Sequence, residues 1–128
     1  MSRPTVAILG ASADRGKFGN KSVRAHLEAG FEVYPINPKG GQIEGLPAYR
    51  SLAEIPAGPL SRVSLYLPPA IGVKALDGIA ARGCDEVWFN PGSDSPDMMA
   101  RAKELELPAI QACSIVALGL SPAQFGDE

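Results

Sequence analysis

Short apolar segments alternate with segments of helical periodicity along almost the whole chain. Five of the apolar segments have the length and composition of buried strands: TVAIL at 5–9, FEVYPI at 31–36, RVSLYL at 62–67, DEVWF at 85–89 and PAIQA at 108–112. Helical patterns lie between them, at 19–30, 68–83 and 93–107, with one or two helical turns at 51–55. Strands joined by helices run parallel, and right-handed crossovers cover both faces of their sheet. We therefore expect an α/β fold, a Rossmann-like three-layer sandwich with a five-stranded parallel sheet.

Turn-forming residues mark the ends of the expected helices. Gly30 and Gly83 follow the last periodic residues of two of them, and glycine is the commonest residue just past a helix. Ser95 is expected as an N-cap, with Pro96 at the first helical position. The segment 37–47 is rich in Gly and Pro and is expected to be a loop. Residues 113–128 fit no single element.

Composition limits the classes of protein to which the chain can belong. A chain of 128 residues, 45% of them hydrophobic, suits one globular domain over 1–128. No apolar run approaches the roughly 18 residues of a membrane helix, and the N-terminal MSRPTVAILGAS lacks the apolar core of a signal peptide. A net charge of −2 does not favour nucleic-acid binding. We expect a cytoplasmic protein that binds neither membranes nor nucleic acid.

Charge and cysteine placement add two further expectations. Residues 1–50 hold seven Lys and Arg against four Asp and Glu, whereas 51–128 hold five against ten. The basic half therefore contains the glycine-rich turn after the first strand. The two cysteines, Cys84 and Cys113, fall at opposite edges of the expected sheet, about 15 Å apart along a strand, so no disulfide is expected. No His and Cys spacing indicates a metal site.

Ligands of open parallel sheets bind beyond the carboxyl ends of the strands, which directs attention to the loops that begin there. The first loop, GASADRGKFGN, combines a glycine turn with basic residues and a helix start. Gly10 lets the backbone approach a phosphate, and the amides of Ala11 and Ser12 point toward the anion. Arg15 and Lys17 can close over its charge. The loop predicts phosphate binding, although such a turn can also serve only to pack helix against strand.

The other three loops narrow the choice of phosphorylated ligand. Strand two ends in Asn37, Pro38 and Lys39 rather than in the carboxylate that binds the ribose of NAD. An amide and a cation suit a ribose that carries a phosphate, as in NADP or coenzyme A; an ordinary Asn-Pro turn is the alternative. The third loop offers an apolar wall formed by Leu67, Pro68, Pro69 and Ile71. The fourth loop offers a second glycine turn with Asn90 and Gly92. An ordinary helix start is the alternative for each of these two loops.

Four segments together resemble a known family. They are VAILGAS at 6–12, GFEVYPINPKG at 30–40, G-x-x-x-Y-x-SLAEIP at 45–56 and VWFNPG at 87–92. In these segments the chain is similar to the small stand-alone CoA-binding domain family, which is related to the CoA-binding domain of the succinyl-CoA synthetase α subunit. Two segments depart from the family pattern. Leu67, Pro68 and Pro69 stand where members often carry basic or polar residues, and the segment after Cys113 lacks a Glu-His pair.

The resemblance implies that the cofactor is coenzyme A or an acyl-CoA. It implies a diphosphate over Gly10, Ala11 and Ser12, with Arg15 or Lys17 nearby. It also implies that the adenosine lies by Asn37, Pro38 and Lys39. The pantetheine arm would then run past Leu67–Ile71 toward Asn90–Gly92.

Catalysis needs positioned acid–base or nucleophilic groups, and the sequence offers few. The one histidine, His26, falls in the middle of a helix and is expected to be an exposed or locally bonded surface residue. Cys113 can reach a CoA thiol, but a small buried apolar role is favoured. We expect a CoA-binding protein without catalytic residues of its own, with a homodimer or a partner enzyme possible. The alternatives are an NADP-dependent oxidoreductase or its remnant, and an interaction domain with an empty nucleotide cleft.

Overall fold

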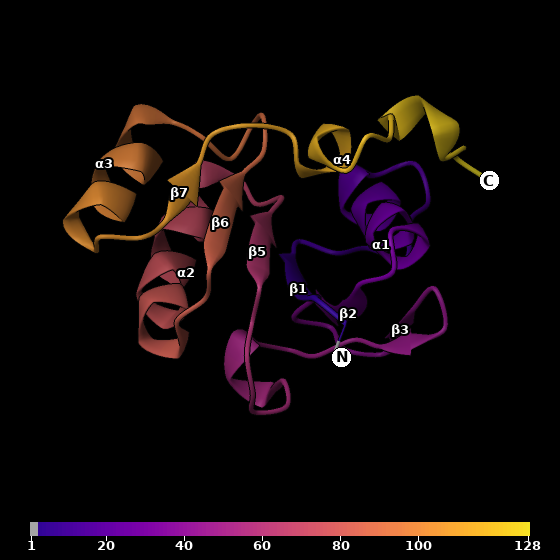
Figure 1. Cartoon of the computed structure of the whole chain (residues 1–128), viewed down its shortest axis with the longest axis horizontal. Coiled ribbons are helices and arrows are strands. Elements are labelled where there is room, and N and C mark those ends of the chain that lie inside the picture. Colours follow the sequence, from indigo (N-terminus) through magenta and orange to yellow (C-terminus); the bar gives the residue numbers. More distant parts are fainter. Residues whose placement is uncertain (1–2) are drawn as a thin grey trace.

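Five parallel strands form the centre of the computed structural model, which describes residues 3–128 (Figure 1). The first two residues of the N-terminal segment discussed above lie outside the described residues. In chain order the strands are β1 (Thr5–Leu9), β2 (Glu32–Ile36), β5 (Arg62–Leu65), β6 (Glu86–Phe89) and β7 (Ala109–Ile110). Their spatial order is β2-β1-β5-β6-β7. The chain therefore leaves β1 toward one side and returns to β5 on the other, and ligands of such sheets bind where the order reverses.

Helices cover both faces of this sheet, which confirms the three-layer expectation. On one face α2 (Pro69–Arg82) packs against α3 (Pro96–Glu104) and the 3₁₀ helix η1 (Leu52–Glu54). On the other, α1 (Phe18–Glu28) contacts α4 (Ser114–Ala117) and the 3₁₀ helix η2 (Pro122–Gln124). Successive residues of β1 alternate between the two cores: Ala7 and Leu9 face the first, Val6 and Ile8 the second. A strand buried on both faces explains the continuous apolar run in its sequence.

The expected helix ends are confirmed by their backbone geometry. Ser95 is the N-cap of α3, and its hydroxyl accepts a hydrogen bond from the amide of Met98 at 3.3 Å. Pro96 occupies the first helical position. Gly83 ends α2 with a φ of 78° and Gly30 follows α1 with a φ of 89°, values that favour glycine.

The segment 37–47 is not only a loop, as expected, because it contains a small hairpin. Strands β3 (Gln42–Ile43) and β4 (Leu46–Pro47) pair antiparallel around Glu44 and Gly45. Both turn residues have positive φ, 51° and 78°, as a tight two-residue hairpin requires. Ile43 is buried and packs on the α1 side of the sheet. That apolar contact stabilises a hairpin which the surrounding Gly and Pro residues conceal in the sequence.

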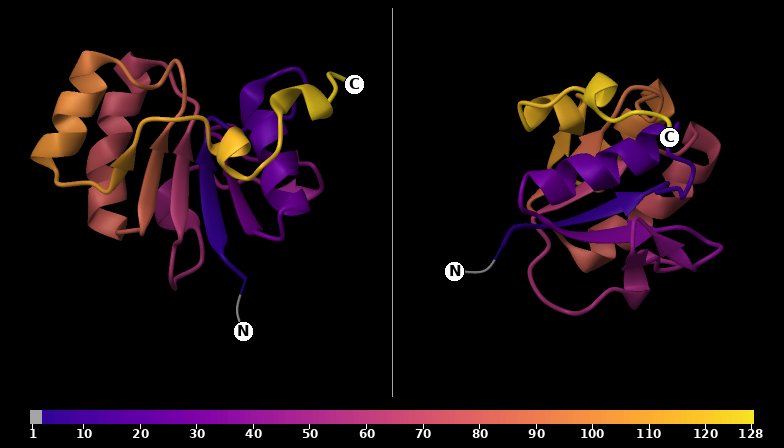
Figure 2. Two further views of the ribbon diagram at one scale, coloured as in Figure 1. Left: turned by 45° about the horizontal axis from the view of Figure 1, so that its top comes forward. Right: turned by 90° about the vertical axis from the view of Figure 1, so that its right-hand side faces the viewer.

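The C-terminal segment lies along α1 (Figure 2). Ile115 and Phe125 are buried against Ala25. Arg24 donates to the carbonyl of Gly126 at 2.8 Å, and Lys21 forms an ion pair with Asp127 at 3.0 Å. Residues 113–128, which fit no pattern, thus form two short helical turns whose apolar side chains complete the core on this face.

Cys84 and Cys113 are both unpaired, as expected. Across residues 3–128, no helix is both long enough and apolar enough to cross a bilayer.

Candidate functional site

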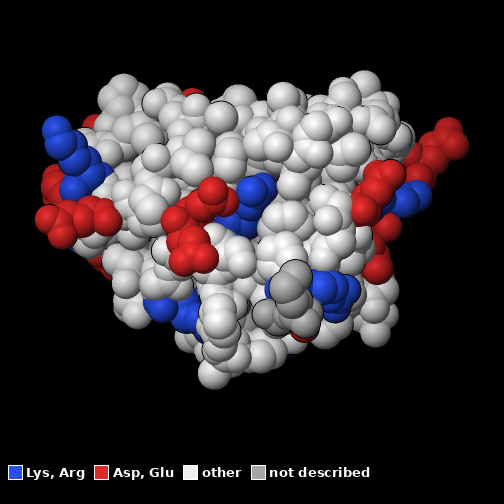
Figure 3. Space-filling view, viewed as in Figure 1, with Lys and Arg blue, Asp and Glu red and all other residues white. Residues whose placement is uncertain are grey.

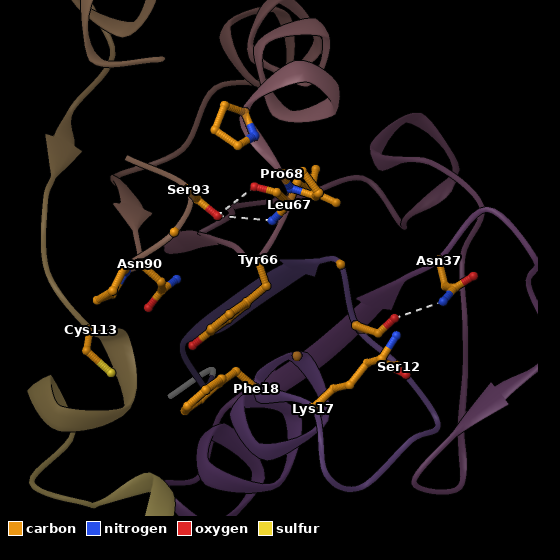
Figure 4. A pocket seen from close by; sticks show the side chains of 16 residues that line it. Ser12, Lys17, Phe18, Asn37, Tyr66, Leu67, Pro68, Asn90, Ser93 and Cys113 are labelled. Atoms are coloured by element: carbon orange, nitrogen blue, oxygen red, sulfur yellow. Dashed lines mark hydrogen bonds between the residues drawn. The ribbon is translucent and has the colours of Figure 1, made fainter. Parts of the chain in front are cut away.

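A cavity of about 650 Å³ opens at the carboxyl edge of the sheet, beside the point where the strand order reverses (Figure 4). Its walls come from the loops after β1, β2, β5 and β6 and from the segment before α4. The lining residues are Gly10, Ala11, Ser12, Lys17, Phe18, Gly19, Asn37, Tyr66, Leu67, Pro68, Pro69, Asn90, Pro91, Gly92, Ser93 and Cys113. Ten residues expected at a ligand site are among them, drawn from all four loops identified in the sequence.

Two glycines let the first loop lie close to its neighbours. Gly10 has a φ of +88°, and a Cβ there would lie 2.2 Å from the carbonyl oxygen of Tyr66. A Cβ on Gly19 would lie 2.1 Å from the carbonyl oxygen of Gly10. Both distances are too short for any side chain. The turn after β1 is therefore held tightly between the end of β5 and the first turn of α1, which is the packing that nucleotide-binding folds use.

The turn after β1 and the start of α1 place free hydrogen-bond donors at one end of the cavity. Within residues 3–128, the backbone amides of Ala11, Ser12 and Gly19 donate no hydrogen bond. Lys17 precedes the first residue of α1, and in Figure 4 its amine lies close to Ser12. Free amides in the turn and at the helix start, the positive end of the helix dipole and a lysine together suit a phosphate.

Arg15 points away from this cavity. Its guanidinium forms an ion pair with Glu44 in the hairpin turn, at 3.2 Å, and donates to the main-chain oxygen of Glu128. Asn20 donates to Glu44 at 3.0 Å and to the carbonyl oxygen of Ser12 at 2.9 Å. The Asn20 hydrogen bond is the largest of the effects that lower the pKa of Glu44. Arg15 thus connects the loop, the hairpin and the C-terminus in this structure.

The two asparagines of the expected site use their side chains within the protein. Asn37 donates to the carbonyl of Ala11 at 2.9 Å and accepts from the amide of Lys39 at 2.8 Å. Asn90 is 1% exposed. Its amide nitrogen donates to the Ser64 hydroxyl and its oxygen accepts from the Ser114 amide, both at 2.8 Å. These side chains fix the positions of the loops that carry them.

Phe18, Tyr66 and Ser93 also line the cavity, although they were not expected at the site. The hydroxyl of Ser93 donates to the carbonyl of Leu67 and accepts from its amide, at 2.9 and 3.0 Å. The Tyr66 hydroxyl is hydrogen-bonded to that of Ser114 at 3.1 Å, and burial raises the pKa of Tyr66. The position of Tyr66 next to Leu67 at the end of a strand was the signal available in the sequence.

Two further hollows adjoin the cavity. One of about 200 Å³ shares Ser12 and Asn37 with it and adds Lys39. The other, of about 590 Å³, shares Gly10 and Leu67. The larger hollow brings Pro38 and Ile71 together with three basic residues, Arg50, Lys74 and Arg82. Every residue expected at the site except Arg15 therefore lines one of three adjacent hollows.

The sequence predicts an exposed or locally bonded surface position for His26. In the structure the residue is fully buried, so the predicted surface position is wrong. Its Nδ1 lies 2.8 Å from the carbonyl oxygen of Ser22, and its ring packs edge-on against Phe31. Burial is the main cause that lowers its pKa to about 4. Its Nε2 lies 3.4 Å from the Arg62 guanidinium at the amino edge of the sheet, opposite the cavity. Among residues 3–128, no group of His, Cys, Asp and Glu side chains is arranged to hold a metal ion.

Known proteins are similar to this chain over part of their own length. A trans-feruloyl-CoA synthase from an unknown prokaryotic organism is 31% identical over 111 residues, 84% of this chain and 16% of that protein. The α subunit of the ADP-forming acetate–CoA ligase I of Pyrococcus furiosus is 43% identical over 58 residues, 41% of this chain and 13% of that subunit. The chain therefore spans less than a fifth of the length of either relative.

Solved structures include proteins of similar size. A conserved hypothetical protein from Pyrococcus furiosus superposes with a TM-score of 0.78 at 29% identity, covering 91% of this chain and 99% of that one. A protein from Thermus thermophilus does so with a TM-score of 0.79 at 28% identity, covering 89% and 87%. The family model described as CoA binding domain matches residues 4–119. The chain belongs to this family of CoA binding domains.

Proposed function

We propose that the protein binds coenzyme A or an acyl-CoA along the three adjacent hollows, without catalysis of its own. The observation that carries the proposal is the anion-binding end of the main cavity. There, the unused amides of Ala11, Ser12 and Gly19 meet Lys17 at the start of α1. The CoA diphosphate binds at this end, where its charge meets backbone donors and a cation.

The two arms of the ligand extend from the diphosphate in opposite directions. The adenosine lies toward Pro38, Lys39 and Ile71, where apolar side chains can cover a purine and basic residues can meet the 3′-phosphate. The pantetheine arm follows Leu67, Pro68 and Pro69 toward Gly92 and Cys113. A neutral, partly apolar arm suits this wall because its residues offer contact area and no charge.

The side chains around the cavity support a binding role. Its lining includes Lys17 and uncharged residues but, in the described part of the chain, no His, Asp or Glu that can exchange a proton near neutral pH. The relatives named as a CoA synthase and a CoA ligase are at least six times longer than the matched segment. We therefore assign to this chain the CoA-holding part of such chemistry rather than the ligation itself.

Isothermal titration of the purified, ligand-free protein with CoA, NADP and free phosphate tests the proposal. We expect CoA to bind, NADP to bind at least about tenfold more weakly, and Lys17→Ala to weaken CoA binding roughly tenfold through the lost charged hydrogen bond. Lys103→Ala, a change on the exposed side of α3, is the matched control. Arg15→Ala should reduce affinity less than Lys17→Ala, because Arg15 is paired with Glu44.

Three outcomes would contradict the proposal. Tighter binding of NADP than of CoA would favour the oxidoreductase alternative. Binding of neither nucleotide would leave the glycine turn with a packing role only. Turnover of an acyl-CoA that Lys17→Ala abolishes would show that the protein has a catalytic activity of its own.

A further inference from the structure

The main cavity changes character along its length. Ser12, Lys17 and Asn37 lie at one end, and the side chains of Phe18, Tyr66 and Cys113 converge at the other (Figure 4). We call this second end the aromatic end. The diphosphate is proposed to bind at the first, so the thiol of CoA and anything attached to it must lie toward the aromatic end.

Phe18 is a large apolar side chain that lies outside the buried cores. It is the first residue of α1, it is 57% exposed, and within residues 3–128 it belongs to none of the buried core clusters. Its ring forms a wall of the cavity, 5.7 Å from the Lys21 amine. When a ligand covers a large exposed apolar group that lines a cavity, the free energy of binding becomes more favourable, because apolar surface is removed from water.

Tyr66 forms a wall that is already fixed. Its hydroxyl is hydrogen-bonded to Ser114, which in turn lies 2.8 Å from Ser64. The ring therefore loses little conformational entropy when a ligand packs on it, and a small loss favours tight binding. Aromatic rings also gain from offset or edge-on contact with another planar group.

Among residues 3–128, no charged side chain lines the aromatic end, and the Lys21 amine beside the Phe18 ring is already paired with Asp127 at 3.0 Å. Of the described residues that line the cavity, Lys17 is the only one with a formal charge near neutral pH, and it belongs to the other end. The side-chain polar atoms of Asn90 and Ser93 are already hydrogen-bonded within the protein. The outer surface over α4 and the carboxyl edge is also largely uncharged, whereas charged side chains gather over α3 and near the C-terminus (Figure 3). A carboxylate on the ligand would therefore lose water there and find no partner.

We propose that the aromatic end holds the acyl group of a CoA thioester, and that it selects an uncharged, planar or apolar acyl group through Phe18 and Tyr66. This inference rests on the proposed CoA-binding function and specifies the class of ligand. Acyl-CoAs with an aromatic or otherwise apolar acyl group bind more tightly than CoA. A dicarboxylic thioester such as succinyl-CoA gains nothing over CoA.

Parallel titrations with CoA, benzoyl-CoA and succinyl-CoA test the inference, and the readout is the ratio of affinities within each protein. In the wild type we expect benzoyl-CoA to bind about tenfold more tightly than CoA, as covering one ring predicts. Phe18→Ala should reduce that ratio to roughly twofold or less, while Phe18→Trp should keep it. Val116→Ala, which removes another exposed apolar side chain outside the cavity lining, should leave the ratio unchanged.

The failure of this inference can be told from the failure of the proposed function. Equal affinity for CoA and benzoyl-CoA, a preference for succinyl-CoA, or a ratio that survives Phe18→Ala would overturn the acyl-group assignment while CoA binding stands. If the wild type binds none of the three compounds, both the proposed function and this inference are wrong.

Discussion

The side chain of Asn90 and the backbone of Ser114 are joined by a hydrogen bond of 2.8 Å from the Ser114 amide to the Asn90 oxygen. The contact links the end of β6 to the start of α4 across 24 residues of sequence. Asn90 also donates to the Leu65 carbonyl at the end of β5. One buried amide thus fixes three segments that border the cavity.

Loss of this amide should destabilise the whole domain. Asn90→Ala leaves the Ser114 amide buried without a partner and removes the hydrogen bonds to Ser64 and Leu65, which costs about 3 kcal/mol in free energy of unfolding. Urea denaturation followed by tryptophan fluorescence measures the change. Gln111→Ala removes an exposed amide that bonds to Asp94 and should cost less than about 0.5 kcal/mol. Similar losses for both variants would contradict the structural role of Asn90.

A methyl group should be tolerated very differently at two helical glycines. Gly19→Ala places a Cβ 2.1 Å from the Gly10 carbonyl oxygen, so α1 must move away from β1 at a cost of about 1–3 kcal/mol. At Gly78, in α2, a Cβ meets no atom within 4 Å. Gly78→Ala should therefore stabilise the protein by about 0.4–1 kcal/mol through helix propensity and unfolded-state entropy. Thermal unfolding of the two variants should show shifts of opposite sign.

Sequence patterns identified the elements whose local signals agree with their tertiary setting. The strand and helix alternation, the Ser95 cap and the glycine stops all hold in the structure. The hairpin at Gln42–Pro47 was missed because it depends on the burial of Ile43 against residues distant in sequence. His26 was misjudged for the same reason, since its partners include Phe31 and Arg62 from neighbouring segments.

The site could be predicted at the level of loops but not of individual side-chain contacts. The four carboxyl-end loops contain the cavity, because strand direction alone brings them together. Sequence cannot tell that Arg15 pairs with Glu44 while Lys17 lines the cavity, since the two basic residues are two positions apart. Their difference arises from the hairpin and the C-terminus, which pack on the same side of the loop.

Acid should destabilise the protein through His26. Its pKa is lowered from 6.5 to about 4 by burial, so between these values the unfolded state binds more protons than the folded state. Stability from this group is complete above pH 6.5 and is lost as the pH falls toward 4, by up to about 3 kcal/mol. Urea unfolding of the wild type and of His26→Gln at several pH values isolates this contribution, because carboxylates act equally in both proteins. Parallel curves for the two proteins between pH 4 and 6.5 would show that His26 does not titrate in this way.

At the adenosine end of the proposed complex, either of two hollows can hold the 3′-phosphate. Lys39 lines the smaller hollow beside Ser12 and Asn37, and Lys74 lines the larger one beside Ile71. We expect dephospho-CoA to bind roughly tenfold more weakly than CoA, because it lacks the charge that a lysine meets. Lys39→Ala should remove most of this difference, as the Asn37-Pro38-Lys39 loop predicts.

Titrations of CoA and dephospho-CoA against Lys39→Ala, Lys74→Ala and the control Lys103→Ala measure the difference in affinity. Loss of the difference in Lys74→Ala alone would instead place the phosphate in the larger hollow, on the α2 side of the sheet.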